Sequence, residues 1–418
     1  MIVVVTSLAV CLFLLAFVAL LLVLQKRLLP QGNATITVND QRELTVATGD
    51  TLITALSGHG IILPSSCGGK GNCGQCRCRV TAGAGEALPI ESNFFTRQEL
   101  GEGWRLGCQF KVRGNIGIAL PQSILDAKEY RCTVVSNRNV ASFIKELKVQ
   151  LPAEAGQLDF RPGSYALLKI PAFKLDFNDI DREQIGSEYL PAWEERGLFG
   201  LRCTNDEATT RAYSMANYPA EGNVFMLTVR IATPPQKRNS KAFADVNPGI
   251  GSSYIFSLKA GDKVDISGPF GDFHITEGDR ERIWIGGGAG MAPLRSQIMH
   301  LTRTLQDTTT PMHFFYGARA LNEVLYLDDF MQLQRDFDNF HFHLALDRQD
   351  PVADRQNISY TQGFVHQMLY DTYLKAHPEP EEVHYYLCGP PMMTSAVLTL
   401  LDNLGVAPNN ISYDNFGN

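Results

Sequence analysis

The sequence predicts a multidomain protein with an N-terminal transmembrane helix, a small α+β domain, an antiparallel β-barrel and an α/β domain with a parallel sheet. Three observations predict this fold class. The chain opens with an uncharged apolar run, its cysteines gather in the first third, and its last third alternates short apolar strands with helices. We expect the domains at 1–27, 28–126, 127–275 and 276–418, which suits a chain of 418 residues.

Composition narrows the function classes. Hydrophobic residues make up 44 % of the chain, enough for a core in each domain, and the formal net charge of −7 argues against a nucleic-acid partner. The nine cysteines are odd in number and unevenly spread. That pattern favours a metal site in a reducing compartment over a disulfide framework.

The N-terminal run, Ile2–Leu24, contains no charged residue. As a helix it would extend about 35 Å, enough to cross a hydrocarbon core of about 30 Å. The alternative is a cleaved signal peptide, but no basic residue precedes the run, and Lys26 and Arg27 follow it. We therefore expect a single-pass anchor with a periplasmic N-terminus and cytoplasmic catalytic domains, because basic residues stay on the cytoplasmic side.

The next segment carries α+β signals. Alternating apolar residues on both sides of Asn39 predict a β-hairpin over 35–46, and Asp50 or Thr51 can cap a short helix that ends at Gly58. A loop rich in glycine and cysteine follows, and then a strand near Cys78.

The cysteine loop predicts an iron–sulfur site. Four thiolates can hold a [2Fe–2S] cluster, and the glycines let the backbone wrap closely and aim N–H groups at the sulfurs. Structural zinc is the alternative, although the paired C-x2-C knuckles usual for zinc are missing. Cys78, two residues further on, is interpreted as a packed side chain. The predicted cluster ligands are Cys67, Cys73, Cys76 and Cys108.

Short apolar runs separated by turns are typical of an antiparallel barrel or sandwich, and we expect the barrel, which extends to about Phe273. Within it, Arg211 can pair with a pyrophosphate, Tyr213 can stack on a flat ring, and Ser214 can donate to a ring nitrogen. A second segment resembles a turn that opens a helix, where N–H groups and hydroxyls meet phosphate. Its candidate residues are Gly249, Ser252 and Ser253. An ordinary strand and an ordinary turn are the alternatives for these two segments.

The last third predicts a doubly wound parallel sheet with a nucleotide site. A glycine-rich turn follows the buried strand at Ile283–Ile285 and opens a helix, so backbone and helix N-terminus can approach a phosphate. The spacing is not the standard G-x-G-x-x-G, and a turn used only for packing is the alternative. The candidate contacts are Gly286, Gly287, Gly288, Gly290 and Pro293.

A second candidate lies at the end of a later strand, where Cys388 and Gly389 precede two prolines. A thiol at the carboxyl edge of a parallel sheet can flank a nicotinamide ring, and an ordinary buried cysteine is the alternative. After the strand ending at Tyr316, Arg319 could meet a 2′-phosphate and so favour NADPH, whereas Glu323 is the nearest acidic residue. The pair His341 and His343 is interpreted as packing.

Together these parts resemble the ferredoxin–NADP reductase superfamily: a ferredoxin-like cysteine loop, an R-x-Y-S barrel, and a G-G-G-x-G-x-A-P segment followed by C-G-P-P. Within it, the N-terminal anchor, the stretch Arg211–Pro219 and the C-terminal Tyr413–Asn418 are similar to the F subunits of bacterial sodium-translocating NADH:quinone reductases. The resemblance covers essentially the whole chain.

The resemblance implies FAD in the barrel, with Arg211 toward its pyrophosphate, Tyr213 along the isoalloxazine and Ser214 near N5. It implies NADH as the substrate and Phe416 as a cover for the flavin that yields to nicotinamide. Hydride carries two electrons and a cluster takes one, so FAD must stand between them. The expected catalytic residues are Ser214, Cys388 and Phe416.

The expected function is the electron-input subunit of an inner-membrane, sodium-translocating NADH:ubiquinone reductase. Its expected partners are other membrane subunits, indirectly ubiquinone, and the bilayer at residues 2–24. The alternatives are the reductase of a multicomponent oxygenase and an anchored ferredoxin carrier. The long segment 172–198 carries many acidic residues and is interpreted either as a docking site for a partner subunit or as a solvated insertion.

Overall fold

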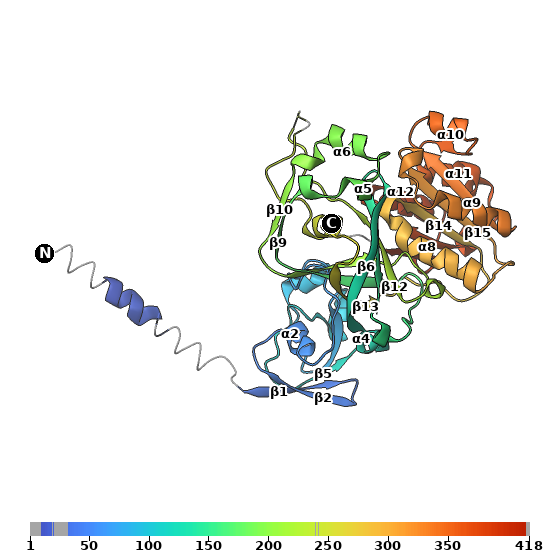
Figure 1. Cartoon of the computed structure of the whole chain (residues 1–418). Helices are drawn as coiled ribbons and strands as arrows, with labels where there is room; N and C mark the ends of the chain where they lie inside the picture. Colours follow the sequence, from blue (N-terminus) through green and yellow to red (C-terminus); the bar gives the residue numbers. More distant parts are fainter. Residues whose placement is uncertain (1–9, 19, 21–31, 239, 241, 415–418) are drawn as a thin grey trace. The chain divides into compact units, whose positions relative to one another are not determined.

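The computed structural model describes residues 10–18, 20, 32–238, 240 and 242–414 (Figure 1). They belong to two compact units, Met1–Ala127 and Lys128–Asn418. Residues 10–18 and 20 are helical. Among the described residues, no helix combines the length and apolar character needed to cross a bilayer. The remainder of the predicted anchor, 2–9, 19 and 21–24, lies outside the described residues.

The first unit is built on a five-stranded sheet in the order β2-β1-β5-β3-β4. The predicted hairpin is confirmed: β1 (Asn33–Val38) pairs antiparallel with β2 (Arg42–Ala47). On its other edge β1 pairs in parallel with β5 (Ile116–Ala119). β3 (Arg77–Ala82) lies between β5 and β4 (Trp104–Leu106), so the strand that leaves the cysteine loop is central in the sheet.

Short α-helices accompany this sheet: α2 (Leu52–Ser57), α3 (Arg97–Gly101) and α4 (Gln122–Asp126). Thr51 is the N-cap of α2, because its hydroxyl accepts a hydrogen bond from the N–H of Thr54. Apolar side chains of α2, β1 and β5 form one core with Cys76, Cys78 and Cys108. The cysteine loop is thereby anchored on a packed interior.

The second unit begins with a six-stranded antiparallel sheet in the order β11-β8-β13-β6-β7-β12. A bridge between Met215 and Leu227 joins the two edge strands and closes the sheet. This confirms the predicted antiparallel barrel. Its strands are β6 (Lys128–Ala141), β7 (Ile144–Gln150), β8 (Tyr165–Ile170), β11 (Thr209–Ser214), β12 (Val224–Arg230) and β13 (Lys263–Phe270), and α7 (Ile250–Ser257) packs against them.

The acidic insertion between β8 and β11 is folded. β9 (Phe173–Asp176) pairs with β10 (Arg202–Asn205), and α5 (Arg182–Ile185) and α6 (Leu190–Arg196) lie between them in the chain. Its apolar side chains are buried in the same core as the barrel: Phe177, Ile180, Ile185, Trp193 and Leu198. The segment is therefore a structured part of the barrel domain, with most of its charged side chains exposed to solvent.

The chain then forms the predicted parallel sheet, in the order β17-β16-β15-β14-β18-β19. Its strands are β14 (Arg282–Gly287), β15 (Met312–Ala318), β16 (Phe340–Leu346), β17 (Thr361–Gln362), β18 (His384–Cys388) and β19 (Ile411–Asp414). Its helices are α8 (Met291–Met299), α9 (Leu327–Asp336), α10 (Pro351–Arg355), α11 (Val365–Thr372) and α12 (Pro391–Asn403) (Figure 1).

Both faces of this sheet are buried, as parallel sheets require. Trp284, Phe314 and Tyr386 pack with α8 and α9 on one face, whereas Ile285 and Leu387 pack with α11 and α12 on the other. The chain order reverses between β14 and β18. A doubly wound sheet binds its ligand at such a switch point, beyond the carboxyl ends of the strands.

Candidate active site

The cysteine loop brings the predicted cluster ligands together in two pairs. The Sγ atoms of Cys67 and Cys73 lie 3.3 Å apart, and the thiol of Cys76 is hydrogen bonded to Cys108. A Cβ placed on Gly69 would lie 3.9 Å from Cβ of Cys108, so the loop closes onto that residue. The loop turns through glycines with positive φ: Gly68, Gly69, Gly71 and Gly74.

The loop also directs backbone N–H groups at sulfur. The Cys76 thiol lowers the pKa of Cys108 to about 6 by hydrogen bonding, and the N–H of Gly71 contributes. Burial acts to raise the pKa of Cys67, but hydrogen bonds led by the Asn72 N–H outweigh it and lower the pKa to about 7. Thiolate is the form that binds metal. The hydrogen bond between Cys76 and Cys108, together with burial, raises the pKa of Cys76, so Cys76 must lose its proton when a metal binds. Four cysteines with N–H donors fit a [2Fe–2S] cluster, and the sulfur set alone would also fit zinc.

Cys78 lies apart from this set. It is buried in β3, and its Sγ donates toward the carbonyl of Arg105 at 3.7 Å. Burial raises the pKa of its thiol to about 12. Cys78 therefore behaves as a packed, protonated side chain.

The predicted flavin residues converge between β11 and α7. A Cβ placed on Gly251 would lie 2.4 Å from Oη of Tyr213 and 3.0 Å from Cγ of Arg211. Only glycine allows this close approach of the start of α7 to both side chains. The guanidinium of Arg211 donates to Oγ1 of Thr209 at 2.9 Å, which holds it along the strand. This arrangement fits a diphosphate beside Arg211 and the helix N-terminus, with a flat ring further along β11.

The two serines at this turn have structural bonds. Oγ of Ser252 accepts a hydrogen bond from the N–H of Ala232 and donates to the carbonyl of Gly249, both at 3.0 Å. Ser253 is fully buried, and its N–H donates to the carbonyl of Gly249, but its Oγ has no hydrogen-bond partner among the described residues. The backbone bond and those of Ser252 shape the turn at the start of α7. The groups available to a phosphate are therefore the Ser253 hydroxyl and the first N–H groups of the helix, which have no partner within the helix itself.

The predicted nicotinamide residues converge at the switch point. Gly286 pairs with Cys388 across β14 and β18. A Cβ on Gly290 would lie 2.2 Å from the carbonyl oxygen of Cys388, so a side chain there would force the turn away from β18. Pro293 follows in the first turn of α8 and is buried. The glycine turn thus packs directly against the strand end at Cys388 and Gly389, at the switch point where a doubly wound sheet has its binding crevice.

A hydrogen bond links the barrel to this crevice. Oγ of Ser214, at the end of β11, donates to Oδ2 of Asp414 at 2.9 Å. Asp414 ends β19 and lies beside Cys388 in the sheet register. Burial raises the pKa of Cys388 well above its ordinary value, and the nearby Asp414 raises it further. Ser214, Cys388 and Asp414 therefore meet where the predicted flavin and nicotinamide sites adjoin.

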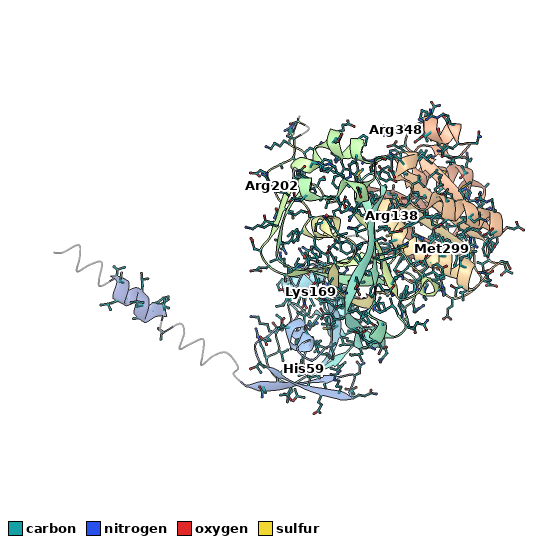
Figure 2. All side chains as sticks on the ribbon, viewed as in Figure 1. His59, Arg138, Lys169, Arg202, Met299 and Arg348 are labelled. Atoms are coloured by element: carbon teal, nitrogen blue, oxygen red, sulfur yellow. The ribbon has the colours of Figure 1, made fainter. Side chains whose placement is uncertain are left out.

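A cavity of about 960 Å³ opens at the carboxyl edge of the sheet. Its sheet side is formed by Gly288 after β14, Arg319 after β15 and Arg348 after β16, the last of which is labelled in Figure 2. Glu323 also lines this cavity. Arg319, which would favour NADPH, and Glu323, the nearest acidic residue, therefore share one cavity. A cavity with several arginines suits the phosphates of a dinucleotide.

The barrel domain completes this cavity with residues that sequence reasoning missed. Arg230 lies at the end of β12. Burial lowers the pKa of Arg230, and the positive charge of Arg319 lowers it further. The acidic insertion supplies Glu195 and Arg196 from α6. No local motif marks these residues. Asp414 was also missed, although it lies within the C-terminal stretch that carries the resemblance, and Phe416 is outside the described residues.

Comparison with protein families matches three parts of the chain. Residues 36–113 match a 2Fe-2S iron-sulfur cluster binding domain, 198–275 an oxidoreductase FAD-binding domain, and 284–399 an oxidoreductase NAD-binding domain. Each match contains candidate residues described above. Each predicted site therefore lies in a part of the chain that matches a domain of the corresponding kind.

Curated relatives match almost the whole chain. The F subunit of the Na(+)-translocating NADH-quinone reductase of Haemophilus ducreyi is 46% identical over 411 residues, covering 96% of this chain and 97% of the relative. Its counterpart in Marinomonas sp. is 43% identical over 403 residues, and that of Serratia proteamaculans 45% over 402, each covering 96% of both chains.

Solved structures share the fold. The Amycolatopsis cytochrome P450 reductase GcoB aligns with a TM-score of 0.61 at 23% identity, over 92% of this chain and 98% of its own. The ferredoxin reductase in carbazole 1,9a-dioxygenase aligns with a TM-score of 0.56 at 20% identity, over 92% and 99%. At this identity the similarity establishes only the three-domain fold.

Proposed function

Because the chain belongs to the family of F subunits of Na(+)-translocating NADH-quinone reductases, we propose that it is the electron-input subunit of such a complex. It oxidises NADH by hydride transfer and passes single electrons to partner subunits and on to quinone. The observation that carries this proposal is identity above 40% over 96% of the chain, which spans all three cofactor domains.

The geometry of each site supports the following assignment of cofactor contacts. Cys67, Cys73, Cys76 and Cys108 would hold the cluster, Arg211 and the start of α7 would hold the FAD diphosphate, and the glycine turn before α8 would hold the dinucleotide. When bound, FAD supplies the conversion from two-electron to one-electron transfer, and the cluster supplies the one-electron exit.

The chain's own residues orient and shield the hydride path. Asp414 accepts the hydrogen bond of Ser214 and so fixes the direction of that hydroxyl at the end of β11. Cys388 remains a protonated thiol at neutral pH, since burial raises its pKa. The thiol is fully buried behind the strand end that would face the nicotinamide ring, where it is polarizable and is no competing nucleophile. Phe416, two residues beyond Asp414 in the sequence, lies outside the described residues, and the resemblance alone makes it the candidate cover for the flavin.

The finer part of the proposal concerns the membrane. Ile2–Leu24 is apolar and uncharged and is followed by Lys26 and Arg27. We assign it as a single-pass anchor in the inner membrane, with a periplasmic N-terminus and the cofactor domains in the cytoplasm. Expression without residues 1–27 should release the chain from membranes while leaving NADH-dependent flavin reduction intact. Membrane retention of that variant would contradict the assignment.

The function is tested on the full-length chain, purified from membranes with its attached subunits. We expect FAD and two iron atoms per chain, anaerobic bleaching of the flavin by NADH, and quinone reduction. A colourless chain, or zinc in place of iron, would contradict the proposal. If the chain had no attached membrane subunits and reduced a soluble acceptor, it would instead be the reductase of a multicomponent oxygenase. If NADH did not bleach the flavin although the cluster was intact, the chain would be an anchored ferredoxin carrier.

A further inference from the structure

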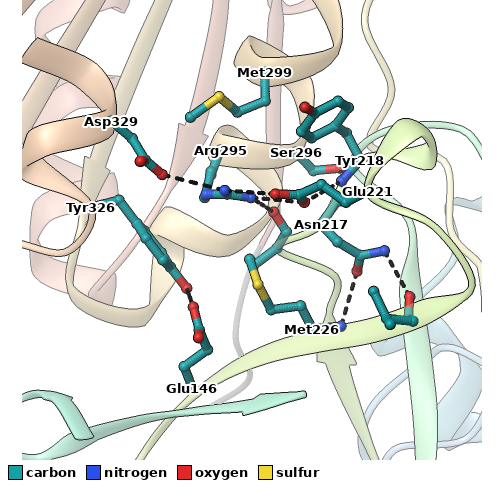
Figure 3. A network of polar contacts seen from close by, with 12 residues as sticks. Glu146, Asn217, Tyr218, Glu221, Met226, Arg295, Ser296, Met299, Tyr326 and Asp329 are labelled. Carbon is teal, nitrogen blue, oxygen red and sulfur yellow. Dashed lines mark hydrogen bonds and ion pairs between the residues drawn. The ribbon is translucent and has the colours of Figure 1, made fainter. Parts of the chain in front are cut away.

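The flavin strand and the nicotinamide helix are joined by a buried polar network (Figure 3). Its centre is Arg295, in the second turn of α8, which is only 6% exposed. The guanidinium donates to both carboxylate oxygens of Glu221, at 2.8 and 3.0 Å, and to the carbonyl of Ala216 at 2.9 Å. Asp329 accepts a further bond at 3.3 Å. A paired carboxylate and a fork of donors make this a strong, directional contact.

The network connects the two segments that carry the reacting groups. Ala216 lies two residues after Ser214, and α8 begins directly after the glycine turn. Next to Arg295, Oγ of Ser296 donates to the carbonyl of Asn217 at 2.6 Å. Oγ1 of Thr228, on β12, donates to the carbonyl of Ala289 within the glycine turn at 3.3 Å. The backbone that follows the flavin strand is therefore fixed to the backbone that would hold the nucleotide.

A second arm reaches the barrel through Tyr326. The ring of Tyr326 lies under the guanidinium of Arg295, 4.8 Å from its centroid, and its hydroxyl donates to Oε2 of Glu146 on β7 at 2.7 Å. Tyr326 has a φ of 54°, a left-handed conformation that is rare for a bulky side chain. A strained residue persists only where its surroundings fix it. The network therefore holds Tyr326 as well as Arg295 in a single arrangement.

We infer that Arg295, through Glu221 and Ala216, is a positioning residue for hydride transfer. It sets the separation between the flavin on β11 and the nicotinamide at the glycine turn. This inference rests on the proposed function, because it requires both ligands. Hydride transfer needs the reacting atoms about 3–3.5 Å apart, and a displacement of 1 Å can lower the rate about a hundredfold. A clamp of this kind would affect the rate more than it affects nucleotide affinity.

The test uses the full-length chain with its flavin and cluster. Arg295→Lys retains the positive charge but removes the planar guanidinium that donates two parallel hydrogen bonds. Glu221→Gln retains the shape of the side chain but removes the negative charge of the ion pair. The matched control is Arg303→Lys in the same helical segment, since Arg303 pairs with Asp336 at 2.9 Å entirely within the nicotinamide domain. Stopped-flow bleaching of the flavin is measured with NADH and with NADH deuterated at C4.

For both test variants we expect the rate constant of flavin reduction at saturating NADH to fall about tenfold or more, with a larger isotope effect. The apparent Kd for NADH and the FAD content should stay within about twofold of wild type, and the control should match wild type. A reduction rate equal to that of Arg303→Lys would overturn the inference, even if Tm falls. If the wild-type flavin itself were not bleached by NADH, the proposed function would fail instead.

Discussion

At the scale of single residues, the bond between Ser214 and Asp414 is the contact closest to the proposed chemistry. Replacing Ser214 with alanine removes the hydroxyl and leaves Asp414 without this donor. We expect the rate constant of flavin reduction by NADH to fall about a hundredfold to a thousandfold, as for loss of one donor at a reacting centre. Stopped-flow bleaching measures the rate, and Ser267→Ala, on β13 of the same barrel, is the control. A change smaller than twofold in Ser214→Ala would contradict this role.

Lys145 shows how burial links stability to pH. Its side chain is fully buried, and Nζ donates to Oε1 of Gln184 in the insertion at 3.0 Å. Burial lowers its pKa to about 7, with the charge of Asp181 acting in the opposite direction. An unfolded lysine titrates near 10.4. Between about pH 7 and 10.4 the unfolded chain therefore binds more protons, and the contribution of Lys145 to the free energy of unfolding rises with pH.

The corresponding prediction concerns Lys145→Met. The Tm of wild type minus that of the variant should increase from pH 7 to pH 9.5. Only wild type has a buried lysine, and this lysine no longer destabilises the fold once it is uncharged. Differential scanning calorimetry across this range measures the difference. Lys148→Met, on the same strand but partly exposed, should differ from wild type by a constant amount. A constant difference for Lys145→Met as well would show that this lysine is not neutralised in the fold.

At the scale of elements, the insertion is held by Trp193 on α6. The indole N–H donates to the carbonyl of Ser142 at 2.6 Å, and the ring stacks on Phe256 at 5.7 Å between centroids. Trp193→Ala should lower the free energy of unfolding by about 3–5 kcal/mol. It should also raise the KM for NADH, since Glu195 and Arg196 on the same segment line the cavity. Chemical denaturation and steady-state kinetics measure the two effects.

The control for the insertion is Glu194→Gln, which changes one charge on α6. It should leave stability and KM within error of wild type. If Glu194→Gln nevertheless lowered quinone reduction by the assembled complex, the acidic face would be a docking site for a partner subunit. An unchanged KM in Trp193→Ala would contradict a role of the insertion at the nucleotide cavity.

Helices and strands whose apolar residues recur with a regular spacing could be predicted from the sequence. Contacts between these elements could not. Alternation around Asn39 predicted the hairpin, and the strands near Ile283 and Tyr385 lie where apolar runs predicted them. The bond from Ser214 to Asp414 joins residues 200 positions apart, and no local pattern encodes such a pair. Segment 172–198 was difficult for a related reason. Its charges predicted a solvated or docking segment, whereas five spaced apolar side chains fold it onto the barrel.

At the scale of the whole molecule, the proposed function requires electrons to leave the flavin one at a time through a cluster held by the cysteine loop. Cys73→Ser removes one thiolate of the close pair with Cys67. We expect NADH to bleach the flavin at a rate within about twofold of wild type, because the barrel and the parallel sheet retain every contact at the hydride path. Quinone reduction by the assembled complex should be abolished, since the one-electron exit is lost.

The matched control for the exit is Cys78→Ala, because Cys78 lies in the same segment but points its thiol at Arg105. It should keep the paramagnetic signal of the reduced cluster and most of the quinone reductase activity, whereas Cys73→Ser should lose both. Iron content and electron paramagnetic resonance after NADH reduction separate the two cases. Loss of the signal in Cys78→Ala with retention in Cys73→Ser would reassign the ligands. Equal quinone reduction in all three chains would show that electrons reach quinone without the cysteine loop.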